Sequence, residues 1–204
     1  MKVKESFWFR YRGWMGVLFF VPAVTGAVFS KPRLGEDTSL DVFMTLLGWL
    51  CFMLYLTLRI WATMYIGSRK DKQLQDQGPY SICRNPLYLG SLCFGLATAF
   101  FLKSLLLLGV VMVVAVVYLK RIIPAEEKVL MKIFKDRFCD YILRTPRIIP
   151  IARNYASSDS VVVNLKAMRL EARRLWLAGL LPFGAELLMH LRSASWWPCF
   201  FNMP

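Results

Sequence analysis

Residues 105–119 read LLLLGVVMVVAVVYL and contain no charged side chain. Residues 40–58 read LDVFMTLLGWLCFMLYLTL and carry one charge, Asp41, at the edge. A hydrocarbon core of roughly 30 Å requires about 20 residues of helix to cross it. Both runs approach that length, so each predicts a helix that crosses a membrane.

The composition of the whole chain supports this interpretation. Of the 204 residues, 57% are hydrophobic, and the mean hydropathy is +0.46. A soluble domain usually contains about 45–50% apolar residues. The sequence therefore predicts an all-α fold: an integral membrane helical bundle.

Three other apolar segments bring the expected number of transmembrane helices to about five. The five segments are residues 13–29, 42–65, 86–101, 105–119 and the weaker 175–191. Lys and Arg are concentrated in the N-terminal residues, in 66–85 and in 120–174, and cytoplasmic loops carry such an excess. We therefore expect these three regions to face the cytoplasm.

The first and last segments each have an alternative interpretation. The first follows a basic N-terminus, and the small residues at 25–27 would also suit a signal peptide. We expect an uncleaved helix, because the aromatic-rich run continues past a usual signal core. The last segment contains Pro182 and Glu186, and a carboxyl group at mid-membrane costs roughly 2.5–3.5 kcal/mol. A short spanning helix with Trp196 and Trp197 in the far interface is preferred to a helix lying in the membrane surface.

The chain is strongly basic, with 26 Lys and Arg against 13 Asp and Glu and a formal net charge of +13. These basic residues flank apolar segments, and no nucleic-acid motif accompanies them. The expected partners are therefore membrane lipids with anionic headgroups, and not nucleic acid.

The cysteines and the histidine do not form a metal-ligand pattern. The five cysteines are odd in number and include no CxxC pair; they are Cys51, Cys83, Cys93, Cys139 and Cys199. His190 is the only histidine. The sequence therefore predicts ordinary thiols, no metal site and no imidazole base.

Residues 78–90, GPYSICRNPLYLG, contain the signals of a turn followed by a helix start. Gly78 and Pro79 favour a turn. Asn85 suits the N-cap position and Pro86 the first helical position, so a helix is expected to begin at Pro86.

The free N–H groups of that helix start would lie next to Arg84, Tyr80 and Tyr88. A helix N-terminus beside an arginine is a favourable place for a carboxylate. The alternative is a capped helix with interfacial tyrosines and no ligand. The spacing alone leaves both open.

Residues 121–130, RIIPAEEKVL, predict a second helix, opened by Pro124 and carrying Glu126 and Glu127 in its first turn. Adjacent carboxylates point about 100° apart on a helix, so one can face inward while the other pairs with Arg121. The alternative is a solvated acid pair on an interfacial helix.

Apolar residues continue at helical spacing and indicate an amphipathic cytoplasmic helix; they are Leu130, Ile133, Phe134, Phe138, Tyr141 and Ile142. Residues 152–160 read as a flexible surface linker.

Three motifs occur in order across a helical hairpin: GPYSICRNPLYLG, RIIPAEEKVL and FCDYILRTPRIIP. Together they resemble the catalytic half of the isoprenylcysteine carboxyl methyltransferase and phospholipid methyltransferase superfamily. The resemblance covers residues 78–150. It implies an integral membrane methyltransferase with a cytoplasm-facing pocket for S-adenosylmethionine, reached by a lipid-like substrate from the membrane.

The resemblance also implies which side chains form the site. Arg121, Glu126 and Glu127 would be catalytic. The cofactor-binding residues would be Tyr80, Arg84, Asn85, Pro86, Tyr88, Gly90, Glu127 and Tyr141. Asn85 stands where histidine is usual in the family, so that position cannot act as a titrating base here.

The residue types suit these roles. Arg84 or the helix N-terminus can hold the carboxylate of the cofactor, and a glutamate can bind its amino group or ribose. A carboxylate acceptor needs no base and could be oriented by Arg121. An amine or a thiol must lose a proton, and Glu126 or Glu127 could accept it.

The sequence therefore predicts three parts: residues 1–65 with two membrane helices, residues 66–153 as the catalytic core, and residues 154–204 as a linker and a C-terminal membrane helix. The expected reaction is carboxylate O-methylation of the isoprenylcysteine type. Alternatives are N-methylation of a phospholipid headgroup amine and S-methylation of a small thiol. A membrane scaffold or lipid-binding protein without catalysis is the alternative outside enzymes.

Overall fold

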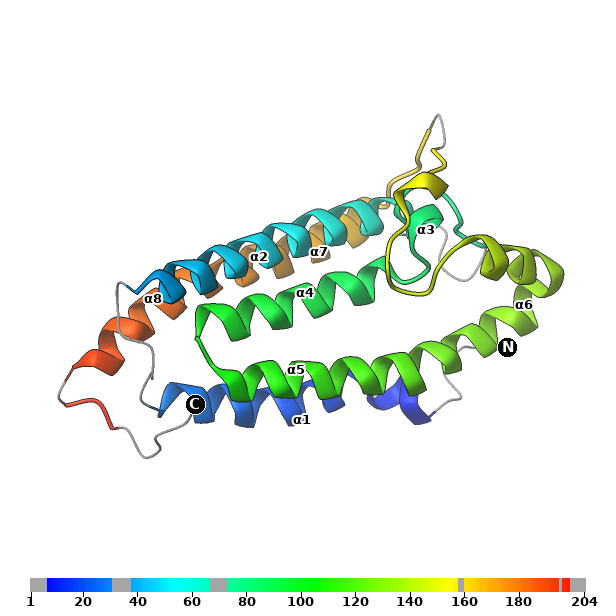
Figure 1. The fold of residues 1–204 in the computed structure, drawn as a ribbon. Helices are drawn as coiled ribbons and strands as arrows, with labels where there is room; N and C mark the ends of the chain where they lie inside the picture. Colours follow the sequence, from blue (N-terminus) through cyan, green and yellow to red (C-terminus); the bar gives the residue numbers. More distant parts are fainter. Residues whose placement is uncertain (1–6, 31–37, 67–72, 158–159, 195, 199–204) are drawn as a thin grey trace.

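In a computed structural model, the chain is a bundle of long helices (Figure 1). The structure describes residues 7–30, 38–66, 73–157, 160–194 and 196–198, and no β-strand occurs among them. The α-helices are α1 Phe7–Val28, α2 Ser39–Ile66, α3 Pro79–Ile82, α4 Pro86–Phe101, α5 Leu105–Val117, α6 Ile123–Arg144, α7 Leu165–Ala178 and α8 Leu180–Ser193. A π-helical segment, η2 Tyr118–Ile122, and a 3-10 turn, η3 Ala152–Asn154, complete the order. The predicted all-α membrane fold is confirmed.

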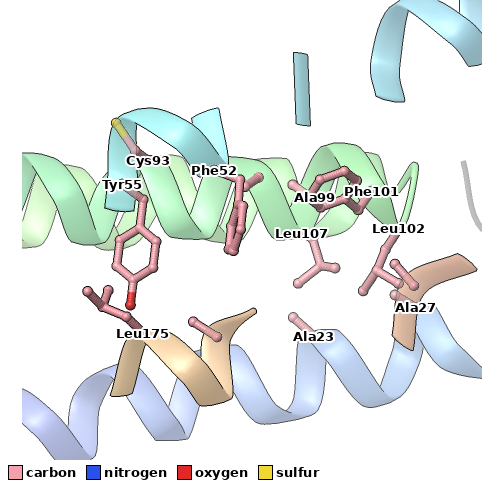
Figure 2. Packing of buried hydrophobic residues seen from close by; sticks show 13 residues of the cluster. Ala23, Ala27, Phe52, Tyr55, Cys93, Ala99, Phe101, Leu102, Leu107 and Leu175 are labelled. Atoms are coloured by element: carbon pink, nitrogen blue, oxygen red, sulfur yellow. The ribbon is translucent and has the colours of Figure 1, made fainter. Parts of the chain in front are cut away.

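The bundle is built on the packing of α2 against α4, with α1 beside α5 and α7 beside α2 (Figure 1). Figure 2 shows the core between these helices: Phe52 and Tyr55 project from α2, and Leu175 of α7 lies near the phenol end of Tyr55. Ala23 and Ala27 of α1 are nearly fully buried in the same cluster. Small side chains on α1 allow the helices to approach closely, as is common between membrane helices.

The α4–α5 hairpin agrees with the sequence to within a few residues. α4 covers the predicted residues 86–101, and α5 begins at Leu105 as expected. The Ser104 hydroxyl caps α5 by accepting a hydrogen bond from the Leu107 amide at 3.3 Å. Lys103 has a positive φ of 50° in the turn and forms an ion pair with Asp41 of α2.

The outer surface of the bundle is apolar. Leu46 of α2, Met112 and Val113 of α5, and Leu187 of α8 are each more than half exposed. Among the described residues, Ser39–Ile66 and Leu105–Arg144 are long and apolar enough to cross a membrane, and Leu18–Val28 and Pro86–Phe101 are shorter apolar helices. These features support a membrane bundle, and the number of five spans stays a prediction.

The helix predicted to open at Pro124 is not a separate helix, and that prediction is corrected. α5, η2 and α6 follow one another without a break from Leu105 to the kink at Lys135. In an α-helix the Pro124 ring would clash with the carbonyl group of Lys120. The wider π turn lies at this point, where the Ile123 amide donates to the Tyr118 carbonyl five residues earlier. The bulge lets the helix continue through the proline.

The predicted amphipathic pattern of α6 is only partly realised. Phe138 and Tyr141 are buried, but Ile133 is 39% exposed. The helix is also kinked at Lys135, whose φ of 44° and ψ of −120° are not helical. The kink turns the last part of α6 back towards α3 (Figure 1), where the two buried aromatic side chains pack.

The C-terminal helix is longer than predicted. α7 and α8 meet at Gly179, whose backbone is helical; α7 runs alongside α2 (Figure 1), and α8 contacts α4. Glu186 lies on the outer surface, with its side chain 74% exposed and 4.0 Å from His190. Whether this helix spans the membrane stays a prediction. The stretch expected to be a loose linker is anchored in part, because the Gly78 amide donates to the Ala156 carbonyl at 2.7 Å.

Candidate active site

One end of the bundle carries a clasp in which residues 141–156 hold the loop around α3. The Tyr141 hydroxyl donates to the Tyr80 carbonyl at 2.6 Å, and the Thr145 hydroxyl donates to the Ser81 carbonyl at 3.3 Å. The Arg84 amide donates to the Pro146 carbonyl at 2.9 Å. The clasp brings two of the three sequence motifs into direct contact.

Two further side chains of the α3 loop fix the same segment. The Cys83 thiol donates to the Ile148 carbonyl at 3.1 Å, and the Asn85 amide nitrogen donates to the Arg147 carbonyl at 3.0 Å. Asn85 is the N-cap residue of α4 as predicted, but its side chain makes no capping hydrogen bond. The amide in place of the usual histidine therefore acts as a structural link to the segment after α6.

Glu127 lies between two arginines. Arg147 donates to both of its oxygens, from Nε to Oε1 at 3.2 Å and from Nη2 to Oε2 at 2.7 Å. Arg84 Nη2 lies 3.4 Å from the Glu127 Oε1 atom. The predicted pairing of a glutamate with Arg121 is therefore corrected: the partners are Arg84 and Arg147.

Arg84 retains unused donors. Its side chain is 9% exposed, and its Nε and Nη1 atoms are buried with no hydrogen-bond partner among the described residues. The buried Tyr80 hydroxyl also has no partner in that part of the chain. Buried donors are normally satisfied, so the unused Arg84 donors indicate space for an anionic ligand.

Glu126 has a different environment from its neighbour. The Tyr88 hydroxyl donates to Glu126 Oε1 at 2.6 Å. The Tyr88 ring contacts the Tyr118 ring of η2 edge-on, with centroids 5.3 Å apart. The Glu126 carboxylate therefore accepts a hydrogen bond from the Tyr88 hydroxyl, and the Glu127 carboxylate accepts from Arg147 and lies beside Arg84.

The structure brings Arg84, Tyr88, Glu126 and Glu127 to one place, and Asn85 and Pro86 form the start of α4 beside them. The predicted residue Tyr80 is instead buried against Ala62 and Tyr65 of α2.

Arg121, Gly90 and Tyr141 do not join this group. Arg121 is exposed on η2. Gly90 faces α2, since a Cβ atom there would lie 3.2 Å from the Cγ and Cδ atoms of Arg59. Tyr141 is buried and directs its hydroxyl to the Tyr80 backbone. The last two positions serve packing in this arrangement.

Sequence reasoning missed Arg147 and Tyr118. Arg147 stands in the third motif, and its place twenty residues after Glu127 gave no local signal. Tyr118 lies near the end of the apolar run of residues 105–119 and was predicted only as part of a membrane helix. An aromatic residue at the end of a membrane helix, just before a proline, is the only signal that could have indicated it.

Burial raises the pKa of three groups in the clasp above their ordinary values. Desolvation raises the pKa of the Tyr80 and Tyr141 hydroxyls and of the Cys83 thiol. Arg59 opposes the rise at Tyr80, and the backbone hydrogen bond at Asn85 and the charge of Arg84 oppose it at Cys83. These three groups are therefore protonated near neutral pH, and the Tyr141 hydroxyl and the Cys83 thiol act as donors.

The described cysteines Cys51, Cys83, Cys93 and Cys139 are free thiols. The described ranges hold no group of three or more His, Cys, Asp or Glu side chains that could bind a metal ion. Cys199 lies outside the described residues.

Comparison with known proteins gives two curated relatives. The chain is 27% identical to the nickel-cobalt-cadmium resistance protein NccN of Alcaligenes xylosoxydans xylosoxydans, over 83% of this chain and 79% of the relative. It is 29% identical to the cobalt-zinc-cadmium resistance protein CzcN of Cupriavidus metallidurans, over 86% of this chain and 81% of the relative. No solved structure matches the chain.

A family comparison identifies the part of the chain that carries the site. The model of the family described as phospholipid methyltransferase matches residues 41–137. The match includes α2, α4, α5 and both glutamates, and it confirms the resemblance seen in the sequence. Residues 41–137 therefore match the phospholipid methyltransferase family, which is part of the isoprenylcysteine carboxyl methyltransferase-like superfamily of membrane methyltransferases.

Proposed function

We propose that this protein is an integral membrane methyltransferase that takes its methyl group from S-adenosylmethionine. The observation that carries the proposal is the position of Glu127 between Arg84 and Arg147, next to unused Arg84 donors and the Glu126–Tyr88 pair. The family match supports a methyltransferase, and this cluster is where the family motifs meet in space.

The charges of the cluster suit the amino-acid part of the donor, which carries both a carboxylate and an ammonium group. The Nε and Nη1 atoms of Arg84 can donate to the carboxylate. Glu127 can accept from the ammonium group once Arg147, which is 44% exposed, turns outward. Tyrosine faces such as that of Tyr88 suit a sulfonium cation. S-adenosylmethionine would supply an activated methyl group, so the residues of the chain need mainly to orient the reactants and exclude water.

Two different roles follow for the adjacent glutamates. Glu127 is held by cations and is assigned to donor binding. Glu126 accepts a hydrogen bond from the neutral Tyr88 hydroxyl and is the available proton acceptor for an acceptor substrate that must lose a proton. An acceptor that arrives as a carboxylate requires no such step.

The proposed acceptor is lipid-like or prenylated, and carboxylate O-methylation of the isoprenylcysteine type is proposed first. The apolar surface of the bundle supports delivery from the membrane. N-methylation of a phospholipid headgroup and S-methylation of a small thiol are the alternative reactions on the same donor site. The metal-resistance names belong to the relatives and do not select an acceptor.

The first experiment is calorimetric titration of S-adenosylmethionine and S-adenosylhomocysteine into detergent-purified protein. We expect micromolar binding that is lost in the Arg84→Ala/Glu127→Gln double variant. Arg137→Ala, an exposed arginine on α6, is the matched control and should bind as the native protein does. Labelled donor offered with a lipid extract then identifies the acceptor.

Absence of binding in a native sample with intact helical circular dichroism would overturn the donor assignment and favour the scaffold alternative. Equal binding by the double variant would show that the donor binds elsewhere.

The proposal also includes a site that faces the cytoplasm. Cys139 of α6 is exposed and tests this orientation in a Cys199→Ser background. An impermeant maleimide should label Cys139 in inside-out membrane vesicles and leave it unlabelled in right-side-out vesicles. The reverse pattern contradicts the assignment.

A further inference from the structure

Arg59 is a charged residue inside the apolar helix α2, in the sequence LTLRIWATMY of residues 56–65. It lies seven residues before the end of α2 at Ile66, or about 10 Å along the helix axis. Ionisable side chains within membrane segments are costly, and they usually have a partner and a function. The mechanism proposed above does not use Arg59.

The partner of Arg59 comes from the C-terminal helix. Arg59 Nε donates to Glu171 Oε1 of α7 at 2.5 Å, and the Glu171 side chain is 5% exposed. Arg174 Nη1 donates to the other oxygen of Glu171 at 3.2 Å, from a side chain that is 66% exposed. Two guanidinium groups therefore share one carboxylate, and the cluster has a formal charge of +1.

The outer donors of Arg59 are not used within the described chain. Its only hydrogen bond there is the one from Nε to Glu171, and its side chain is 16% exposed. The two terminal amino groups, Nη1 and Nη2, therefore remain as a pair of parallel donors. A guanidinium group presents such a pair in the geometry that matches a carboxylate or a phosphate.

Arg59 also contacts α4 and lies near the α3 loop. Its Cγ and Cδ atoms pack against Gly90 of α4, where an added Cβ atom would lie only 3.2 Å away. Its charge acts on Tyr80, whose buried hydroxyl has no partner in the described chain. Arg59 thus connects α4 and the α3 loop to α7.

Exposed apolar side chains lie beside the cluster. Ile60 of α2 is 41% exposed, and Trp176 and Leu177 of α7 are 71% and 53% exposed. Arg174 of the same cluster is 66% exposed, so the cluster lies where charged and apolar surfaces meet. An anionic head attached to an apolar chain suits such a place, because the chain can stay on the apolar surface while the head reaches Arg59.

We propose that the Nη donors of Arg59 bind the anionic head of a membrane-borne amphiphile, a carboxylate or a phosphate, and that Glu171 is the positioning residue that fixes the Arg59 guanidinium. This inference rests on the proposed function, in that the amphiphile would be the methyl acceptor. It assigns acceptor orientation to Arg59, in place of the exposed Arg121. It also makes α7, which lies outside the family match, part of the site.

The test is binding of radiolabelled palmitate and of hexadecanol to detergent-purified protein, with no methyl donor present. The two probes share a chain of sixteen carbons and differ in the charge of the head. We expect the native protein to prefer palmitate. The Arg59→Gln/Glu171→Gln variant removes both charges together and should lower palmitate affinity by about tenfold or more, with hexadecanol unchanged. Arg137→Gln is the matched surface control.

Three outcomes would overturn the inference: equal binding of both probes by the native protein, native palmitate affinity in the double variant, or an equal loss in the surface control. If the double variant does not fold, Arg59→Lys is the second variant. A lysine held by Glu171 lacks the parallel donors and should lose the preference for palmitate.

Competition separates a membrane-borne anion from a soluble one. Hexadecyl phosphate should displace palmitate, whereas inorganic phosphate at the same concentration should not. Displacement by inorganic phosphate alone contradicts a membrane-borne ligand.

Titration with S-adenosylhomocysteine in the same samples distinguishes a failure of the methyl-donor site from a failure of the anion-binding role of Arg59. Donor binding without a palmitate preference rejects only the role of Arg59. A palmitate preference without donor binding retains the anion site and rejects the methyltransferase assignment.

Discussion

Arg147 holds both carboxylate oxygens of Glu127, with its Nε atom 3.2 Å from Oε1 and its Nη2 atom 2.7 Å from Oε2. The two side chains differ in exposure, at 12% for Glu127 and 44% for Arg147. A mostly buried carboxylate is therefore covered by an arginine that can move outward. Arg84 holds the same carboxylate from the buried side.

Substitutions of the two adjacent glutamates should have different effects on donor binding and on turnover. Glu127→Gln leaves Arg84 and Arg147 without their anion and should weaken S-adenosylhomocysteine binding by about tenfold or more. Glu126→Gln should keep donor binding, and turnover of a carboxylate acceptor should stay within about threefold, because that acceptor needs no base. Calorimetry and steady-state kinetics measure the two effects.

A large loss of turnover in Glu126→Gln, on the order of 10²-fold or more with donor binding intact, would identify an amine or thiol acceptor instead. Equal losses of donor binding in both variants would contradict the division of roles.

Tyr141→Phe should destabilise the clasp without removing a charged group. The lost hydroxyl donates to the buried Tyr80 carbonyl at 2.6 Å. Leaving a buried carbonyl unsatisfied costs about 1–3 kcal/mol in the free energy of unfolding. Unfolding followed by circular dichroism during denaturant titration measures the change. Tyr155→Phe is the control, because Tyr155 is 52% exposed and should change stability little.

The sequence predicted the start of α4 correctly because its signals are local: a proline in the first turn after a suitable N-cap residue. It did not predict the continuity of α5 and α6, because Pro124 read as a helix start and the π turn that accommodates it has no distinct pattern. The partners of Glu127 were also not predictable. Arg147 lies beyond the end of α6, and only the kink at Lys135 brings the chain back to the site.

Gly90→Ala and Gly109→Ala should have opposite effects on stability. A Cβ atom at Gly90 would lie 3.2 Å from the stem of Arg59, which its ion pair holds in place, so we expect a loss of about 1 kcal/mol or more. No atom lies within 4 Å of the corresponding position at Gly109 on α5. There the better helix propensity of alanine should add up to about 1 kcal/mol.

Both glycine variants are measured by denaturant titration in one detergent. A stabilising Gly90→Ala would mean that Arg59 is free to move, and it would weaken the case for a fixed anion-binding position.

The Cys83 thiol should react slowly with alkylating reagents. Burial raises its pKa above the ordinary value of 9.0, so at pH 8 its thiolate fraction is smaller than that of an ordinary thiol. Because the folded thiol holds its proton more tightly than the unfolded one, the linked stability is fully present below pH 9 and is lost as the pH rises through the folded pKa.

Iodoacetamide labelling at pH 8, read peptide by peptide by mass spectrometry, checks this prediction. The exposed Cys139 is the internal reference. Equal rates at the two cysteines would show that Cys83 is not protected in the folded protein.

The π-helical segment Tyr118–Ile122 amounts to one extra residue in an otherwise regular helix. Removing a single residue there would close the wider turn and bring the Pro124 ring against the carbonyl group four residues earlier. The helix would then kink just before Glu126 and Glu127, although no residue of the site had been substituted. The alignment of the two glutamates therefore depends on the exact chain length between α5 and Pro124, and a one-residue deletion in a related chain would mark a bundle that keeps its membrane helices and loses its site.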